Sequence, residues 1–268
     1  MKFKQFSRKY LSIPYGIFMA VFIVLPLIIL FLYSFAENQQ DGSLSFSFTF
    51  ENFKQVFSST NLIMLKRSFK VGIITTLVCL VAGYPIALIL NNSTFKYKSV
   101  IVMLFMIPMW VNFLIRTLAT KSAFNALGIP LGGFAVTFTM IYNYIPFMIM
   151  PIYNTMQKID KCLFEGASDL GAGPFKTLLK VTLPLSLPGV LSGITMVFMP
   201  SITTFAIANI MSNNKYSLVG DYIQNEALNA ANFNVASAIS LIILIVIGIS
   251  MFVVNKYDKD GSAAGGMM

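Results

Sequence analysis

The 268-residue sequence contains no histidine, and charged residues make up only 11% of it. The absence of histidine excludes imidazole acid–base catalysis and the usual zinc sites. A water-soluble domain usually carries about 25% charged residues, so this chain lacks the charge to cover a soluble surface. Cys79 and Cys162 fall in a predicted membrane span and in a predicted loop, which excludes a disulfide framework.

Apolar residues make up 56% of the chain, and its mean hydropathy is +0.75. They form long stretches that contain no charged residue. About 20 helical residues cross the ~30 Å hydrocarbon core of a bilayer. Six uncharged stretches are predicted to be spans: Ile13–Phe35, Val71–Leu90, Ser99–Ile115, Leu131–Gln157, Val181–Asn214 and Ala227–Asn255. We expect the short third stretch to continue through Arg116 to Ala119, and the long fifth one to end in an outer loop. The sequence predicts an all-α polytopic membrane protein.

The basic residues predict the orientation. With the N-terminus in the cytosol, twelve of the nineteen Lys and Arg residues lie inside, as the positive-inside rule expects. Both termini are therefore predicted to be cytosolic, with residues 1–260 forming one six-span domain and residues 261–268 a disordered tail. The net charge of +9 is explained by basic residues that flank the spans and contact anionic lipid headgroups. The sequence has no stripe of basic and aromatic residues of the kind that binds nucleic acid.

Enzymatic and ion-coupled functions are disfavoured. No predicted soluble segment is long enough for an enzyme domain, and the phosphate-binding pattern G-x-x-x-x-G-K-[ST] is absent. No pair of acidic residues falls inside a span, which disfavours a carrier driven by protons or sodium. We expect no enzyme activity, metal or cofactor on this chain, and either a pore or a permease that another protein energises.

The most informative segment is the predicted cytosolic loop at residues 158–185. Asp160 is expected to cap a first helix, Gly171 to end it in a left-handed conformation, and Pro174 to open a second helix. Pro184 and Pro188 are expected to turn the chain into the fifth span. The apolar residues at helical spacing are Leu163, Phe164, Ala167 and Leu170 in the first helix, and Phe175, Leu178, Leu179 and Val181 in the second. Such helices pack on their own bundle, lie on lipid, or dock a partner.

At this loop the chain resembles the inner-membrane permeases of bacterial ABC importers. Their signature is E-A-A, three residues, Gly, nine residues, a branched aliphatic residue, any residue and Leu-Pro. It is matched by Glu165-Gly166-Ala167, Gly171, Val181 and Leu183-Pro184. Gly166 departs from the usual Ala and loosens the helix by about 1 kcal/mol. Ser47–Phe53 is similar to the segment that precedes the second span in many such permeases, and Pro108–Thr117 and Ile145–Tyr153 are similar to the spermidine/putrescine (PotB-like) branch.

The resemblance implies a type I importer permease (MetI-like) architecture and a set of partners. These are a dimer of ATPase subunits that holds the ATP and Mg, a second permease subunit (a related PotC-like chain, giving a heterodimer) and an extracytoplasmic substrate-binding protein. The loop would be the ATPase-coupling element, through Glu165, Gly166, Ala167, Asp169, Leu170, Gly171, Phe175, Val181, Leu183 and Pro184. Glu165 is expected to contact a basic ATPase side chain, or else to interact with its own helix dipole. Gly189 and Gly193 are expected either to form a small-residue packing face or to mark only an ordinary kinked span.

Polyamine is the substrate that the resemblance implies, and a cation of this kind needs aromatic faces and oxygen acceptors. The candidate pathway residues are Trp110, Asn112, Tyr142, Asn143, Tyr144, Asp221 and Glu226. Core or lipid packing is an equally open interpretation of each. Arg116 instead suits an anion. Three alternatives therefore stay open: an ABC permease for another solute such as an inorganic anion or a sugar, an ATPase-independent channel or facilitator, and a membrane scaffold protein.

Overall fold

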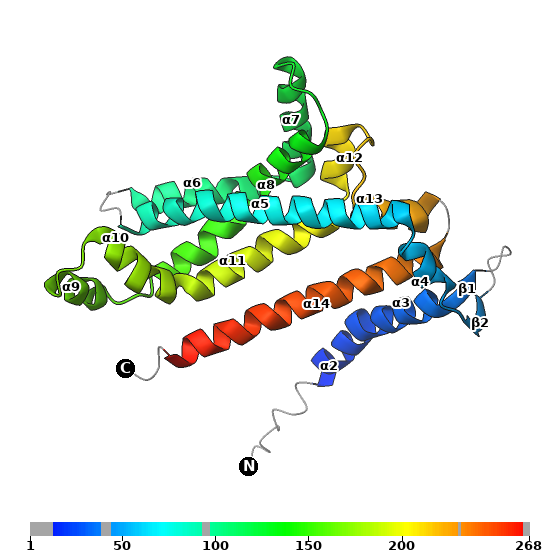
Figure 1. Ribbon diagram of the computed structural model, residues 1–268, viewed down its shortest axis with the longest axis horizontal. Helices are drawn as coiled ribbons and strands as arrows, with labels where there is room; N and C mark the ends of the chain where they lie inside the picture. Colours follow the sequence, from blue (N-terminus) through cyan, green and yellow to red (C-terminus); the bar gives the residue numbers. More distant parts are fainter. Residues whose placement is uncertain (1–12, 39–43, 93–96, 230–231, 265–268) are drawn as a thin grey trace, which may run out of the picture. The chain divides into compact units, whose positions relative to one another are not determined.

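The computed structural model describes residues 13–38, 44–92, 97–229 and 232–264, which are mostly helical (Figure 1). Contacts within the chain group them into two units. The smaller unit comprises the residues up to Leu62 together with Ile223–Ile245, and the larger one comprises Ile63–Tyr222 and the residues from Val246 onward. A single domain over 1–260 and cytosolic termini stay predictions.

The elements follow one another along the chain with short connections. The first part contains α2 (Ile13–Met19), the π-helical turn η1 (Ala20–Val24), α3 (Leu25–Phe35), β1 (Ala36–Asn38), β2 (Leu44–Phe48) and α4 (Glu51–Val56). Next come α5 (Ser59–Asn92), α6 (Lys98–Trp110), α7 (Phe113–Ala126), α8 (Gly133–Met156), α9 (Lys161–Asp169) and α10 (Pro174–Thr177). The last are η2 (Leu178–Thr182), α11 (Leu183–Thr203), α12 (Ala206–Ser212), α13 (Val219–Gln224), η3 (Asn225–Asn229) and α14 (Phe233–Ala264).

Five helical segments in the described part of the chain are long and apolar enough to cross a membrane: Pro14–Phe35, Asn61–Asn92, Gly133–Met156, Pro174–Thr203 and Phe233–Phe252. A sixth is present if the pair Val100–Trp110 and Phe113–Ala126 counts as one span, although the pair is bent by 92°. The six predicted stretches therefore coincide with the helices that have spanning character.

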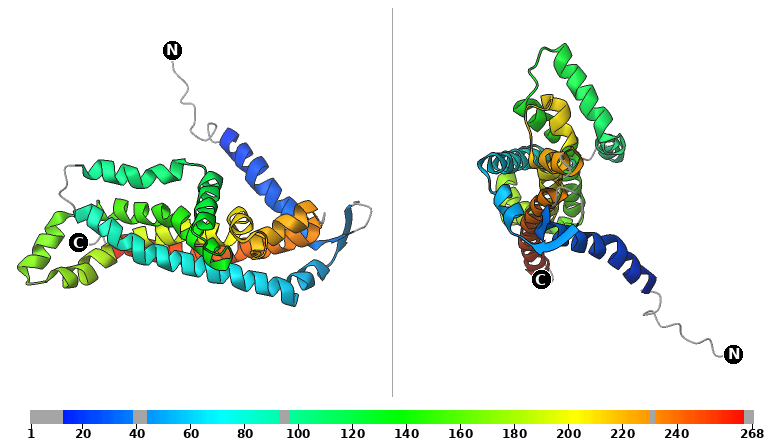
Figure 2. Two further views of the ribbon diagram at one scale, coloured as in Figure 1. Left: turned by 90° about the horizontal axis from the view of Figure 1, so that it is seen from above. Right: turned by 90° about the vertical axis from the view of Figure 1, so that its right-hand side faces the viewer.

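The third predicted stretch does continue through Arg116 to Ala119, but as two helices joined at a bend and not as one straight helix. Helix α6 ends at Trp110, Val111 is extended with ψ of 134°, and α7 starts afresh at Phe113. Pro108 weakens the end of α6 because it has no N–H to donate to the preceding turn. Asn112 then caps the new helix, since its side-chain oxygen accepts a hydrogen bond from the backbone N–H of Leu114 at 2.8 Å. Figure 2 shows α7 turning away from α6.

The structure fixes where the last two predicted spans end. Helix α11 ends at Thr203 and α12 follows separately, so the final residues of the long fifth stretch lie beyond the span, as predicted. Helix α14 continues to Ala264, and residues 261–264 of the predicted tail are therefore helical, while residues 265–268 lie outside the described part.

The fold is helical, as predicted, apart from a short β-hairpin in the smaller unit. Strands β1 and β2 pair antiparallel, with Ala36 opposite Phe48 and Asn38 opposite Leu44. The Phe35 ring lies 5.5 Å from Phe48 and 5.0 Å from Phe53 between ring centroids. Backbone acceptors at the turn from α3 into β1 are satisfied by distant amides, since Nδ2 of Asn52 and Nδ2 of Asn234 both donate to the Ala36 carbonyl at 2.9 Å.

The core of the larger unit lies between α5, α8 and α11, which run alongside one another (Figure 1). Its fully buried side chains include Cys79, Met148, Ile149, Ile152 and Val197. Glycines allow the close approach: a Cβ on Gly189 would lie 2.6 Å from the Pro151 carbonyl oxygen, and one on Gly193 would lie 2.7 Å from Sδ of Met148. This bears out the predicted small-residue face in the fifth span.

Candidate functional site

The segment formed by α9 and α10, residues 161–177, is here called the elbow, and its bend follows the local sequence. The Asp160 carboxylate accepts a hydrogen bond from the Cys162 N–H at 3.1 Å and caps α9, as predicted. Gly171 has φ of +72° and ends the helix, as also predicted, because only glycine adopts this conformation without steric cost. Gly173 then caps α10, whose first residue is Pro174.

The elbow exposes apolar side chains beside a carboxylate. Leu170 is 87% exposed and Phe175 is 71% exposed, and Glu165 is exposed on the same short segment. Gly166 and Ala167 are half-buried, and Asp169 and Gly171 are exposed. Seven of the ten predicted coupling residues therefore gather on the elbow, and their role in coupling stays a prediction.

The other three predicted coupling residues lie on a helix that does not turn where we expected. Val181, Leu183 and Pro184 belong to one continuous helical rod that runs from Pro174 to Thr203, so Pro184 and Pro188 do not redirect the chain. The π-helical turn η2 just before Pro184 accommodates the missing proline N–H by shifting the hydrogen-bond pattern locally. The second half of the elbow is thus rigidly continuous with α11.

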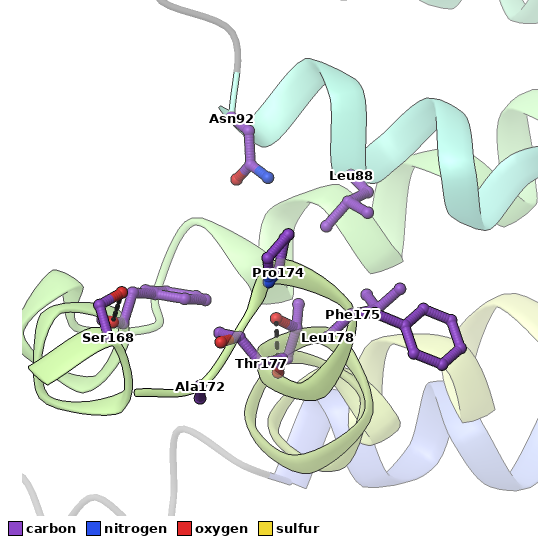
Figure 3. A pocket seen from close by; sticks show the side chains of 10 residues that line it. Leu88, Asn92, Ser168, Ala172, Pro174, Phe175, Thr177 and Leu178 are labelled. Carbon is purple, nitrogen blue, oxygen red and sulfur yellow. Dashed lines mark hydrogen bonds between the residues drawn. The ribbon is translucent and has the colours of Figure 1, made fainter. Parts of the chain in front are cut away.

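A groove of about 480 Å³ lies between the elbow and the end of α5. Its lining residues are Leu88, Asn92, Phe164, Ser168, Ala172, Pro174, Phe175, Thr177, Leu178 and Thr182. Figure 3 shows Leu88 and Asn92 on one side of the groove and Ser168, Ala172 and Pro174 on the other. The sequence analysis missed the two α5 residues, because nothing local indicates that the end of α5 meets the elbow.

Cys162 is an exposed thiol on α9. A side-chain hydrogen bond with Asp160, together with the negative charges of Asp160 and Glu165, raises the pKa of Cys162 above its usual value. The thiol form is therefore favoured near neutral pH.

A second cavity of about 480 Å³ lies at the 92° bend between α6 and α7. Its lining residues are Met109, Trp110, Val111, Asn112, Phe113, Arg116, Tyr144, Phe147, Pro200, Thr203 and Thr204. Three predicted pathway residues, Trp110, Asn112 and Tyr144, meet here. Trp110 is 83% exposed, whereas the side-chain oxygen of Asn112 is already engaged in capping α7.

The remaining predicted pathway residues are not among those that line this cavity. Asn143 is buried and its Nδ2 donates to Oγ1 of Thr117 at 3.4 Å, and Tyr142 lies elsewhere on α8. Glu226 accepts a hydrogen bond from Nδ2 of Asn232 at 3.0 Å. Asn143 and Glu226 thus make hydrogen bonds within the chain, whereas Tyr142 is 45% exposed.

Asp221 has a structural role at the start of α13. Its Oδ2 accepts a hydrogen bond from the Leu218 N–H at 2.7 Å, which closes the first turn. Its Oδ1 is buried and has no hydrogen-bond partner within the described residues. Burial raises the pKa of Asp221 to about 6, and the bond from Leu218 offsets part of that rise.

Arg116 is the charged residue among the cavity-lining residues that were not in the predicted pathway; Thr203 and Thr204 were also missed. Arg116 is only 8% exposed, and its Nε and Nη1 are buried without a partner among the residues that the structure describes. The sequence signal was present, because a basic residue inside an apolar stretch usually faces a cavity or a partner.

Comparison with known proteins decides what kind of protein carries these two sites. The family model of the "binding-protein-dependent transport system inner membrane component" matches residues 2–257. The chain belongs to this family. It is therefore a multi-pass permease component of a bacterial inner-membrane transport system, rather than a facilitator or a scaffold.

Curated relatives of this permease match over most of their length. It is 30% identical over 255 residues to the spermidine/putrescine transport system permease protein PotB of Haemophilus influenzae, with 89% of each chain covered. It is also 30% identical over 252 residues to the PotB of Escherichia coli K12, with 88% of this chain and 92% of that one covered. A bacterial ABC transporter that imports the acidic polysaccharide alginate shares the fold, with a TM-score of 0.72, 15% identity and 94% of each chain covered.

Proposed function

We propose that this permease carries polyamines into the cell as a subunit of an ATP-binding-cassette importer. The main support is the similarity to the two PotB proteins, which covers close to nine-tenths of the chain. The importer would use alternating access, in which rigid helical bundles expose a central path to one side of the membrane and then to the other.

The cavity at the α6–α7 bend has groups that suit an extended cation. Trp110 and Tyr144 offer aromatic faces, and Thr203 and Thr204 offer hydroxyl oxygens. A cation over an aromatic face gains about 0.5–2 kcal/mol, depending on how much water is removed. The cavity's volume of about 480 Å³ lies within the range of small-molecule sites.

The elbow would couple transport to nucleotide hydrolysis on separate ATPase subunits, which would hold the ATP and Mg. Leu170 and Phe175 are apolar and largely exposed, and Glu165 adds a charge beside them. Exposed apolar side chains on a segment that also carries polar residues mark protein–protein interaction sites. Because α10, η2 and α11 form one continuous rod, a displacement of the elbow would move α11 with it.

Two further partners complete the proposal. The family name implies a substrate-binding protein, which would deliver the polyamine to the outer face. The second permease subunit would be a related PotC-like chain, so that the membrane part is a heterodimer.

Arg116 favours one competing substrate class. A guanidinium in the wall of the cavity would attract an anion and repel a polyamine. An importer for a small anion is therefore the second candidate function.

Uptake by the complete transporter tests the substrate. Both permease subunits and the ATPase are reconstituted in vesicles with ATP on the ATPase side and the binding protein on the other. Radiolabelled spermidine and putrescine are compared with sulfate, phosphate and a sugar. We expect ATP-dependent uptake of the polyamines alone. Uptake of an anion in their place would refute the polyamine proposal and support the second candidate.

Glu165→Lys tests the coupling role, with Glu51→Lys as the matched control. Both carboxylates are exposed, and Glu51 lies on α4 in an ion pair with Lys54 at 3.1 Å. A hydrogen bond to a charged group contributes about 1.5–3 kcal/mol, so Glu165→Lys should weaken ATPase docking by about 10-fold or more. Substrate-stimulated ATP hydrolysis should fall in Glu165→Lys only. Equal activity in the two variants would rule out the contact.

A further inference from the structure

Arg116 carries a charge that nothing in the described part of its own chain neutralises. Two of its nitrogens, Nε and Nη1, are buried without a hydrogen-bond partner there, and the side chain is 8% exposed. The one ion pair found among the described residues joins Lys54 to Glu51. A buried charge is costly unless it is paired and hydrogen-bonded, so a complementary group is expected from outside this chain.

The side chain remains reachable through the cavity at the α6–α7 bend, because Arg116 is one of its lining residues. Most of the lining is apolar, and Trp110 in it is 83% exposed. Ile115, next to Arg116 in the chain but outside the cavity lining, is 62% exposed. A guanidinium within an apolar surface is complementary to a carboxylate within an apolar surface. It is not complementary to a polyamine, which carries charge of the same sign.

A second copy of this chain does not offer such a carboxylate. None of its ten acidic residues lies in a segment of spanning character or in α6 and α7. On the predicted outer side, Asp221 is only 3% exposed, so its unpaired Oδ1 is buried within its own fold and does not reach the surface. Glu226 binds Asn232, Glu51 pairs with Lys54, and Glu37 lies in β1, outside the apolar segments. The complementary group must therefore come from a different chain.

We propose that Arg116 pairs with an Asp or Glu carboxylate in an apolar segment of a second, non-identical permease subunit. The guanidinium fork would donate two parallel hydrogen bonds to it, the geometry that arginine and carboxylates favour. The pairing would join the subunits beside the cavity and remove the positive charge from the path of a cation. The second permease subunit is the partner named in the proposed function, and the last consequence rests in addition on the polyamine substrate.

The test measures subunit association in the complete transporter. An affinity tag on this chain retains the second permease subunit after detergent extraction, and the retained fraction is measured over a dilution series. We expect Arg116→Gln to weaken association about a hundredfold, because it leaves the partner's carboxylate buried and unpaired. Arg116→Lys should show an intermediate loss, since it keeps the charge without the fork.

Lys121→Gln is the matched control. Lys121 is a basic residue on the same helix, and its Nζ already donates to Oδ1 of Asn213 at 2.7 Å within the chain. We expect wild-type retention for this variant. The amount of each variant in the membrane is measured in parallel, so that failed insertion is not taken for failed association.

A charge swap between the two subunits is the decisive test of the proposed pairing. Arg116→Glu should abolish association, and an Arg introduced in place of the paired acidic residue in the partner's spans, found by testing each Asp and Glu there, should restore it. Wild-type retention by Arg116→Gln, or no rescue at any of these positions, would overturn the pairing. A changed substrate preference with intact association would also overturn it, because Arg116 would then contact the substrate. Uptake by the wild-type transporter tests the polyamine function separately.

Discussion

Replacing Gly189 with alanine perturbs the closest helix contact in the larger unit. A Cβ at this position would lie 2.6 Å from the Pro151 carbonyl oxygen and 2.6 Å from Oγ1 of Thr155. The first of these atoms belongs to the backbone of α8 and cannot move away without shifting the helix. Alanine would therefore push α11 from α8 along the main packing contact of the core.

The expected loss of stability in Gly189→Ala is the difference between two opposing effects. Overpacking a well-packed core costs about 1–3 kcal/mol, and contact with a backbone atom places Gly189→Ala near the upper end. Alanine also favours the helix by about 1 kcal/mol over glycine. The net destabilisation is about 2 kcal/mol, which corresponds to a melting temperature about 4–8 °C lower for a chain of this size.

Gly166→Ala is the control with the opposite expected sign. Apart from its chain neighbours and the backbone of its own helix, nothing in the described structure lies within 4 Å of a Cβ built on Gly166. Thermal unfolding in detergent, followed by size-exclusion chromatography, should show a lower melting temperature for Gly189→Ala and no loss for Gly166→Ala. A Gly189→Ala protein as stable as the wild type would refute the close packing of α8 and α11.

Two further predictions concern single titratable groups. A maleimide should label the exposed Cys162 and spare the fully buried Cys79. The labelling rate should keep rising above pH 9, because Asp160 raises the pKa of the Cys162 thiol. Bound ATPase should slow the labelling, and the same rate with and without the ATPase would contradict docking at the elbow. The pKa of Asp221 rises on folding from 3.8 to about 6, so its neutral form stabilises the fold below pH 3.8 and this stabilisation is lost as pH rises through 6. Asp221→Asn should flatten the fall in melting temperature over this range, and an unchanged slope would exclude the burial of this carboxyl group.

The elbow shows how much local sequence determines. The Asp160 cap, the left-handed Gly171 and the initial Pro174 were all predicted correctly, because each depends on the backbone within a few residues. The expected turn at Pro184 was wrong for the complementary reason. A proline in a helix is tolerated when the neighbouring turn can rearrange, and η2 provides that rearrangement.

The β-hairpin had a sequence signal that the analysis did not use. Leu44–Phe48 alternates apolar residues with serine, the period-2 pattern of a strand. It was overlooked because the apolar stretches around it indicate helices so strongly.

The number of spanning segments, their positions and the family signature could be predicted from sequence alone, because hydrophobicity and helix termination are properties of neighbouring residues. The gathering of Trp110, Tyr144, Arg116 and Thr204 around one cavity could not. It depends on the 92° bend at Val111 and on the packing of α8 against α11, which bring together side chains far apart along the chain. For the same reason, only the tertiary structure shows that the Arg116 charge is buried without a partner.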